Sequence, residues 1–135
     1  MDLSTLKFTK THEWISVSAD GAGALVGISD YAQESLGDVT YVELPKPGKA
    51  MKQGDVLATV ESVKAASDIF APAAGTVEAV NDVLTGTPEV INASPYEEGW
   101  ICRLTLDAGS MEAALASGSL MDAAAYGEFC KGLSE

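Results

Sequence analysis

Short runs rich in apolar residues recur along most of the chain, and turns that contain glycine or proline separate them. Alternation at every second residue predicts β-strands, because successive side chains of a strand point to opposite faces of its sheet. The turn signals recur about every eight to twelve residues, a spacing typical of an all-β sandwich or barrel. We therefore predict a mainly β fold. The strands are expected at residues 12–17, 24–27, 39–44, 56–63, 65–70, 76–80 and 100–106.

Local signals inside this pattern predict three details. The turn 20–23 joins the first two strands as a hairpin. Asp30 followed by Gln33 indicates a short helix capped by Asp30, and Gly37 ends it. Alternation in the strand 39–44 places Val39, Tyr41 and Glu43 on one face and Thr40, Val42 and Leu44 on the other.

The sequence changes character after residue 106, where alanine becomes frequent. Ser110 and Ser119 are candidate N-caps for two short helices, because a serine hydroxyl can accept a hydrogen bond from the first-turn amides. The second helix would carry Leu120, Tyr126 and Phe129. We expect both helices to pack across the β-unit and cover an edge or an open end.

The chain has 135 residues, 47% of them hydrophobic and 21% charged, which suits one globular domain with a core. We expect a single domain, residues 1–135, with a β core near 12–106 and helices near 110–131. No apolar run is long enough for a membrane-spanning helix. The start, MDLSTLKFTK, lacks the features of a secretory signal or a transit peptide. Either the protein acts where it is made, or a targeting segment has been removed.

The formal net charge is −12, and Arg103 is the one arginine. Nucleic acid and anionic membrane surfaces would repel such a chain, so neither is an expected partner. The charge instead favours solubility and attraction to basic patches on partner proteins.

Few residues suit catalysis or metal binding. His12 is the one histidine, and neither a nucleophile motif nor a phosphate-binding glycine loop is present. Cys102 and Cys130 lie too far apart in sequence for metal-ligand spacing, and no converging set of metal ligands stands out. Cys102 falls on the apolar face of the strand 100–106, which predicts a small buried hydrophobe. An independent enzyme is therefore not expected.

The segment ESVKAASDIF, residues 61–70, places Lys64 between two β-type runs. A β-turn at this junction would direct the lysine side chain into solvent. No residue from 62 to 67 brings a charge that could pair with the ammonium, and the small neighbours leave the amine open. These features suit a lysine that another enzyme acylates, which converts a cation into a neutral amide. On the residues alone, an ordinary solvated turn lysine remains the commoner alternative.

The same segment resembles the lipoylation segment of the glycine cleavage system H-protein family, and the similarity covers nearly the whole chain. Several motifs follow that family's order: THEW (11–14), VGISDYAQ (26–33), LGDV (36–39), VELP (42–45), AP with Gly75 (71–75), PEVIN (88–92), and SPY with GW (94–100). The resemblance implies a lipoyl/biotinyl-type β-sandwich, the barrel-sandwich hybrid, with short helices and a C-terminal helical extension. It also implies that Lys64 carries lipoic acid as an amide.

The resemblance assigns expected roles to five further residues. Glu61 and Gly75 match positions that lipoate-attaching enzymes recognise; the ordinary alternatives are a surface acid and a turn glycine. Thr11, Glu13 and Asp68 match residues that contact the lipoyl arm. Carboxylates there would bind the protonated amine of an aminomethyl cargo and keep water out. Ordinary strand-surface residues are the alternative for these three.

A member of this family is implied to be a carrier rather than a catalyst. It would accept an aminomethyl group from the pyridoxal-phosphate-dependent glycine decarboxylase (P protein) and present it to the folate-dependent aminomethyltransferase (T protein). Dihydrolipoamide dehydrogenase (L protein) would then reoxidise the arm. We expect the chain to be a monomer. We also expect a mature chain in the mitochondrial matrix, because the segments 92–100 and 126–130 look closer to plant mitochondrial members of the family. The bacterial cytoplasm is the alternative.

Other interpretations remain. A biotin carrier usually has methionines beside its lysine, whereas Val63 and Ala65 stand here. A lipoyl domain of a 2-oxo acid dehydrogenase would normally be shorter and tethered by a flexible linker, and no such linker is seen. An H-like protein could instead donate lipoyl groups to other complexes. An unmodified interaction module would leave Lys64 as a turn residue.

Overall fold

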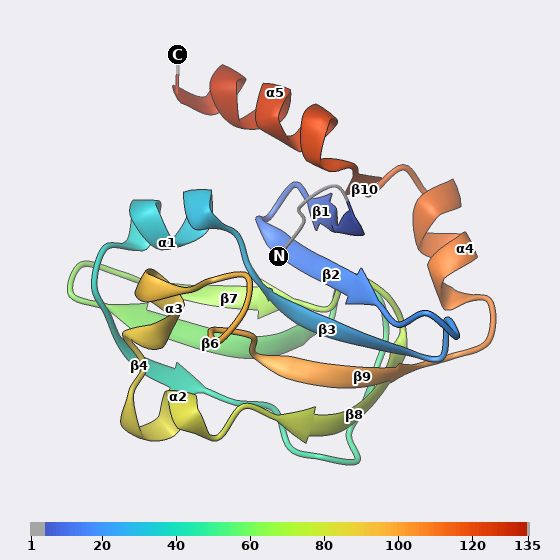
Figure 1. The fold of residues 1–135 in the computed structure, drawn as a ribbon, viewed down its shortest axis with the longest axis horizontal. Coiled ribbons are helices and arrows are strands. Elements are labelled where there is room, and N and C mark those ends of the chain that lie inside the picture. The colour runs from blue at the N-terminus through green and yellow to red at the C-terminus, as the bar shows by residue number, and fades with distance from the viewer. Residues whose placement is uncertain (1–4, 135) are drawn as a thin grey trace.

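Two antiparallel β-sheets form the body of the computed structural model, which describes residues 5–134 (Figure 1). The strands are β1 (Lys7–Thr9), β2 (Glu13–Val17), β3 (Gly23–Ile28), β4 (Val39–Glu43), β5 (Ala50–Met51), β6 (Val56–Ser62), β7 (Ala66–Phe70), β8 (Gly75–Val80), β9 (Cys102–Leu106) and β10 (Leu120–Met121). The larger sheet has the order β10-β1-β2-β3-β9-β8-β5, and the smaller has the order β4-β6-β7. The predicted mainly β fold is confirmed.

Every predicted strand is present, but β1, β5 and β10 were missed because two or three residues are too few to show alternation. β5 pairs with β8, and β1 pairs with both β2 and β10. β1 and β10 lie outside the expected β core, 12–106. Their pairing places Thr9 opposite Leu120, so the C-terminal segment lies beside the N-terminal strand.

The main hydrophobic core lies between the two sheets. Its largest fully buried members are Ile15, Ile28, Leu84, Ile91, Ile101 and Leu104. A second cluster contains Trp14, whose indole donates to Pro95 O at 3.0 Å. Trp14 faces Gly27 across the β2–β3 pair, and a Cβ on Gly27 would lie 2.7 Å from the indole ring. The aromatic ring therefore fits only because its cross-strand neighbour has no side chain.

The predicted alternation in β4 is wrong at its first residue. Val39 and Val42 are both buried, whereas Thr40 and Tyr41 between them are exposed. The register with β6 shifts between Val39 and Tyr41, which is the signature of a β-bulge. The extra residue lets Val39 and Val42 face the core together. Val39 therefore does not share a face with Tyr41 and Glu43.

Within residues 5–134, the helices around the sheets are α1 (Asp30–Leu36), α2 (Val83–Gly86), α3 (Val90–Ala93), α4 (Ser110–Ala116) and α5 (Ala123–Ser134). The cap of α1 is Ser29 rather than the predicted Asp30, because the Ser29 hydroxyl accepts from Ala32 N at 3.1 Å. Gln33 Nε2 instead donates to the Asp30 carboxylate at 2.8 Å. Gly37 ends the helix as predicted, with φ 75°. The four-residue helices α2 and α3 were not predicted.

The two predicted serine caps near the C-terminus are wrong. Gly109 precedes α4 as its cap residue, and Ser110 is the first helical residue. After Ser119 the chain forms β10 rather than a helix, so Leu120 is a strand residue. α5 begins later, where the Asp122 carboxylate accepts from Ala125 N at 2.8 Å.

α5 covers the β10–β1 end of the larger sheet (Figure 1). This agrees with the prediction that a C-terminal helix covers an edge of the β-unit. The ring of Tyr126 stacks on Phe8 of β1, with centroids 4.5 Å apart and an interplanar angle of 4°. None of the helices found in residues 5–134 is both long and apolar enough to cross a membrane.

Candidate functional site

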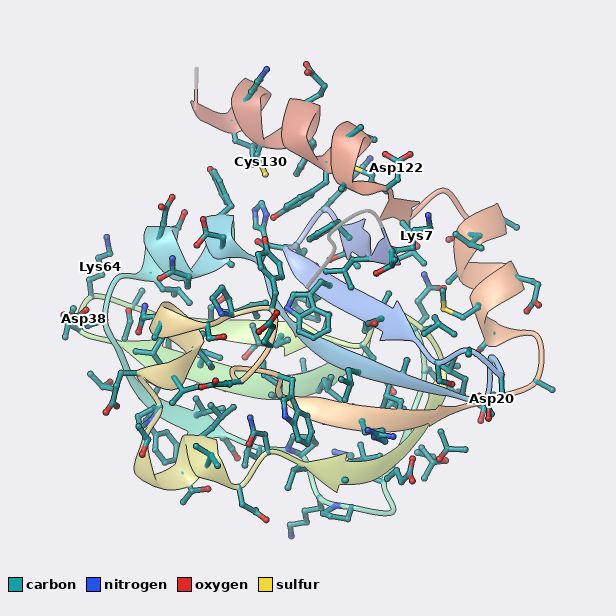
Figure 2. The ribbon with its side chains drawn as sticks, viewed as in Figure 1. Lys7, Asp20, Asp38, Lys64, Asp122 and Cys130 are labelled. Atoms are coloured by element: carbon teal, nitrogen blue, oxygen red, sulfur yellow. The ribbon has the colours of Figure 1, made fainter. Side chains whose placement is uncertain are left out.

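Lys64 lies at the exposed tip of the β6–β7 hairpin (Figure 2). The tip is closed by Ser62, whose amide donates to Ala65 O at 2.8 Å and whose hydroxyl accepts from Ala65 N at 3.2 Å. Among residues 5–134, no ion pair involves Lys64. The predicted open lysine in a turn is confirmed, and its amine is accessible to another enzyme.

A side-chain amide on α3 holds the loop that contacts the hairpin tip. Asn92 Nδ2 donates to Gly37 O at 2.8 Å, and Asn92 Oδ1 accepts from Val39 N at 2.9 Å. Between these two contacts, Asp38 O accepts the amide of Val63 at 3.1 Å. Asn92 therefore fixes the loop against which the residue before Lys64 is anchored.

The bare backbone of Gly37 also lies beside the lysine stem. A Cβ on Gly37 would come within 3.4 Å of Lys64 Cε. Figure 2 places Lys64 and Asp38 together at the end of the molecule near α1. Any larger residue at Gly37, whose φ is positive, would be strained, and its Cβ would be in van der Waals contact with the lysine stem.

A cleft of about 400 Å³ opens beyond the other end of β7. Its walls come from residues 9–11 and 13, the turn 53–54, the segment 70–72, and the turn 117–119. Four segments distant in sequence therefore meet there, and the β1–β10 pairing brings the last of them into place.

The Glu13 carboxylate lies in this cleft and is fully buried. The hydroxyls of Thr9 and Thr11 each donate to Oε1 at 2.5 Å. Oε2 receives one long bond, from Phe70 N at 3.3 Å. A buried carboxylate is costly unless hydrogen bonds compensate for its lost hydration. Oε2 keeps acceptor capacity beyond the bond from Phe70 N.

Thr9 orients Glu13 from two sides. Its hydroxyl donates to Glu13 Oε1 and also accepts from Glu13 N at 3.0 Å. Thr9 thus fixes both the backbone and the carboxylate of Glu13. The sequence alone did not point to Thr9, because it comes from β1, a strand too short to predict.

Asp68 does not line the cleft. It is exposed on β7, where Thr59 Oγ1 donates to its carboxylate at 3.3 Å. Asp68 shares a strand face with Phe70, which does line the cleft, because the two are separated by one residue. Asp68 therefore lies on β7 between Lys64 and the cleft-lining Phe70, while Thr11 and Glu13 line the cleft itself.

The sequence profile of the glycine cleavage H-protein family matches residues 6–132. This chain belongs to that family. Members of this family are the lipoyl carriers of the glycine cleavage system. The chain is therefore a carrier subunit of that system.

Individual relatives agree with this assignment. The chain is 52% identical over 123 residues to the glycine cleavage system H protein of Opitutus terrae, covering 91% of this chain and 92% of that one. It is 48% identical over 130 residues to the mitochondrial glycine cleavage system H protein 2 of Arabidopsis thaliana, covering 96% and 78%. The crystal structure of a glycine cleavage system H protein from Mycobacterium marinum superposes with a TM-score of 0.80 at 30% identity, covering 98% of both chains. The lipoyl-type sandwich expected from the resemblance is confirmed.

The two residues expected to guide lipoate attachment to this H-protein family member lie in different environments. Glu61 is exposed on β6, opposite Ala66 and close to the hairpin tip. Gly75 is buried at the start of β8 rather than in a turn. A Cβ there would lie 2.6 Å from Thr105 O of β9. Close packing of two strands thus explains the glycine, and its role in recognition stays a prediction.

Gly75→Ala is expected to lower the free energy of unfolding by about 1–3 kcal/mol, because the new methyl group would force β8 and β9 apart. Chemical denaturation measures the change. Gly86→Ala is the matched control, since a Cβ at Gly86 meets nothing within 4 Å. If Gly75→Ala kept wild-type stability but lost lipoylation, Gly75 would act through recognition instead of packing.

His12 belongs to a structural network rather than to a catalytic triad. Its Nδ1 lies 2.6 Å from the Tyr126 hydroxyl, which also lies 2.6 Å from Ser29 Oγ. Burial lowers the pKa of His12 and raises the pKa of Tyr126, so both groups favour their neutral forms. The network ties α5 to the start of β2 and to the cap of α1.

Cys102 is buried, as the sequence indicated. Burial raises the pKa of the Cys102 thiol to about 12, which makes it an inert core residue. Within residues 5–134, no group of three or more His, Cys, Asp or Glu side chains could hold a metal ion.

Proposed function

We propose that Lys64 carries lipoic acid as an amide and that the cleft around Glu13 receives the aminomethyl cargo of that arm. Two features support this most: an exposed lysine that forms no ion pair among residues 5–134, and a buried carboxylate with spare acceptor capacity at the far end of the same hairpin. Bound lipoate supplies a dithiolane whose sulfur carries the cargo. The residues of this chain provide the attachment point, the route and the binding site.

Lys64 and Phe70 are six residues apart, which corresponds to about 20 Å of extended strand. An arm attached at the hairpin tip would point toward the cleft when it lies along β7. Asp68 would meet the ammonium of the cargo on this route, and Glu13 would bind it in the cleft. Thr11 would contribute through its hydrogen bond to Glu13.

The partners follow from the same proposal. A lipoate-attaching enzyme would read the surface around Glu61, with Gly75 as the second expected element. The P protein would load the arm, the T protein would unload it and the L protein would reoxidise it. The chain itself would be a non-catalytic monomer with neither nucleic acid nor a membrane among its partners, because the net charge of −12 opposes both.

The compartment is proposed from the relatives. The similarity to the plant mitochondrial protein supports the mitochondrial matrix, and the similarity to proteins of Opitutus terrae and Deinococcus radiodurans supports the bacterial cytoplasm. These two bacterial relatives have higher sequence identity to the chain than the plant protein has. Their higher identity favours the bacterial cytoplasm, the alternative given from the sequence.

The test begins with the wild-type chain and a lipoate-attaching enzyme. Intact mass spectrometry with peptide mapping should find one lipoyl increment, located at Lys64. The modified chain should then support glycine-dependent exchange of carbon dioxide by the P protein, whereas the unmodified chain should not. A biotin increment would make the chain a biotin carrier, and no increment with either enzyme would leave an unmodified interaction module.

A further inference from the structure

The turn after α4, residues 117–119, forms one wall of the cleft. This turn lies outside the strands of the two sheets. We call residues 117–121 the C-terminal strap; they comprise the turn after α4 and the strand β10. Its turn lines the cleft, and its strand pairs with β1, where Leu120 lies opposite Thr9. The strap is thus linked to the residue that orients Glu13.

A hydrogen bond joins this strap to the opposite rim of the cleft. Gln53 Nε2, in the turn between β5 and β6, donates to Ser119 Oγ at 2.5 Å. Ser119 Oγ also lies 2.9 Å from Ser117 Oγ and 3.4 Å from Ala114 O, to which it can donate. Gln53, Ser117 and Ser119 all line the cleft.

We propose that Gln53 and Ser119 form a latch that closes the rim of the cleft over the aminomethyl cargo. The inference rests on the proposed function, because the latch matters only if the cleft shelters that cargo. Gln53 and Ser119 are positioning residues. They hold two turns together and thereby limit the access of water to the group bound at Glu13.

Exclusion of water matters because the cargo is hydrolysable. A water molecule adds its oxygen to the cargo carbon, the carbon–nitrogen and carbon–sulfur bonds break, and the products are ammonium, formaldehyde and the free thiol. No oxidant or reductant is needed, because water is the one co-reactant. A closed rim slows this reaction without taking part in it.

The latch is suited to opening as well as to closing. Its hydrogen bond is exposed, and an exposed bond between neutral groups contributes little net free energy. A glycine with positive φ follows Gln53 and another precedes Ser119, so each partner sits on a tight turn. The arm can therefore displace the latch on entry, and the expected effect of removing it is about two- to tenfold.

The test uses Gln53→Met, which keeps the length of the side chain but has no donor, together with Ser119→Ala and the double variant. Hydrogen exchange of the strap amides is measured in the unmodified chain, and ammonia release is measured in the cargo-bearing chain. Each single variant should raise both rates about two- to tenfold. The double variant should show no further increase over Ser119→Ala, because Ser119→Ala has already removed the bond to Gln53.

Lys52→Ala is the matched control, because Lys52 lies in the same turn but does not line the cleft. Glu13→Gln separates the two proposals. If Glu13→Gln speeds ammonia release but neither latch variant does, the latch is wrong and the cleft assignment stands. If no variant speeds release, the cleft assignment fails and the latch fails with it. Faster hydrogen exchange of the strap amides without faster ammonia release would also overturn the latch.

Discussion

Replacing Lys64 with arginine is expected to abolish glycine-dependent carbon dioxide exchange by the P protein. Arginine keeps the positive charge at the hairpin tip, but the lipoate-attaching enzyme has no amine to acylate. The side chain is exposed and forms no ion pair within residues 5–134, so the free energy of unfolding should change by less than about 0.5 kcal/mol. The exchange rate with labelled carbon dioxide should fall to the level measured without the chain.

Lys131→Arg is the control for this substitution. Lys131 is also exposed, on α5, and its only ion pair in the described part of the chain is with Glu128 at 3.6 Å. This variant should keep both the lipoyl mass increment at Lys64 and the exchange rate. Wild-type exchange by Lys64→Arg would defeat the central assignment, because it would show that the chain works without an arm at that position.

The strands and the lysine hairpin were predictable because their signals are local. A mostly apolar run indicated β6, the extended segment after Lys64 indicated β7, and the small residues around Lys64 indicated an open turn. The bulge in β4 was not predictable, since one extra residue changes which side chains face the core without changing the composition of the strand. Asn92 was missed for a related reason, because its partners lie more than fifty residues away.

The cleft was only partly predictable. It depends on the pairing of β1 with β10, and neither strand is long enough to show a pattern. One local signal did exist at Glu13. This residue shares a strand face with Ile15, which is buried, so alternation alone places a carboxylate on the inner face of β2. A charged residue at an inward position indicates a buried polar site, and hydrogen bonds from Thr9 and Thr11 supply the compensation.

Glu13→Gln is expected to speed ammonia release from the cargo-bearing chain about ten- to a hundredfold, while lipoylation of Lys64 stays at the wild-type rate. Glutamine keeps a carbonyl that can accept from Thr9 and Thr11, so the cleft should keep its shape. It removes the negative charge that would bind the ammonium of the cargo. Hydrogen bonds to charged groups contribute about 1.5–3 kcal/mol, and each 1.4 kcal/mol corresponds to a tenfold change.

Asp68→Asn should have a smaller effect, below about fivefold, because interactions of exposed charges are screened by water. Glu78→Gln is the matched control, since Glu78 is an exposed strand carboxylate that does not line the cleft. Ammonia release is measured for all three variants after mass spectrometry has verified equal lipoylation. Unchanged release in both Glu13→Gln and Asp68→Asn would mean that the carboxylates do not protect the cargo. A larger effect at Asp68 than at Glu13 would place the cargo on the exposed face of β7 instead of in the cleft.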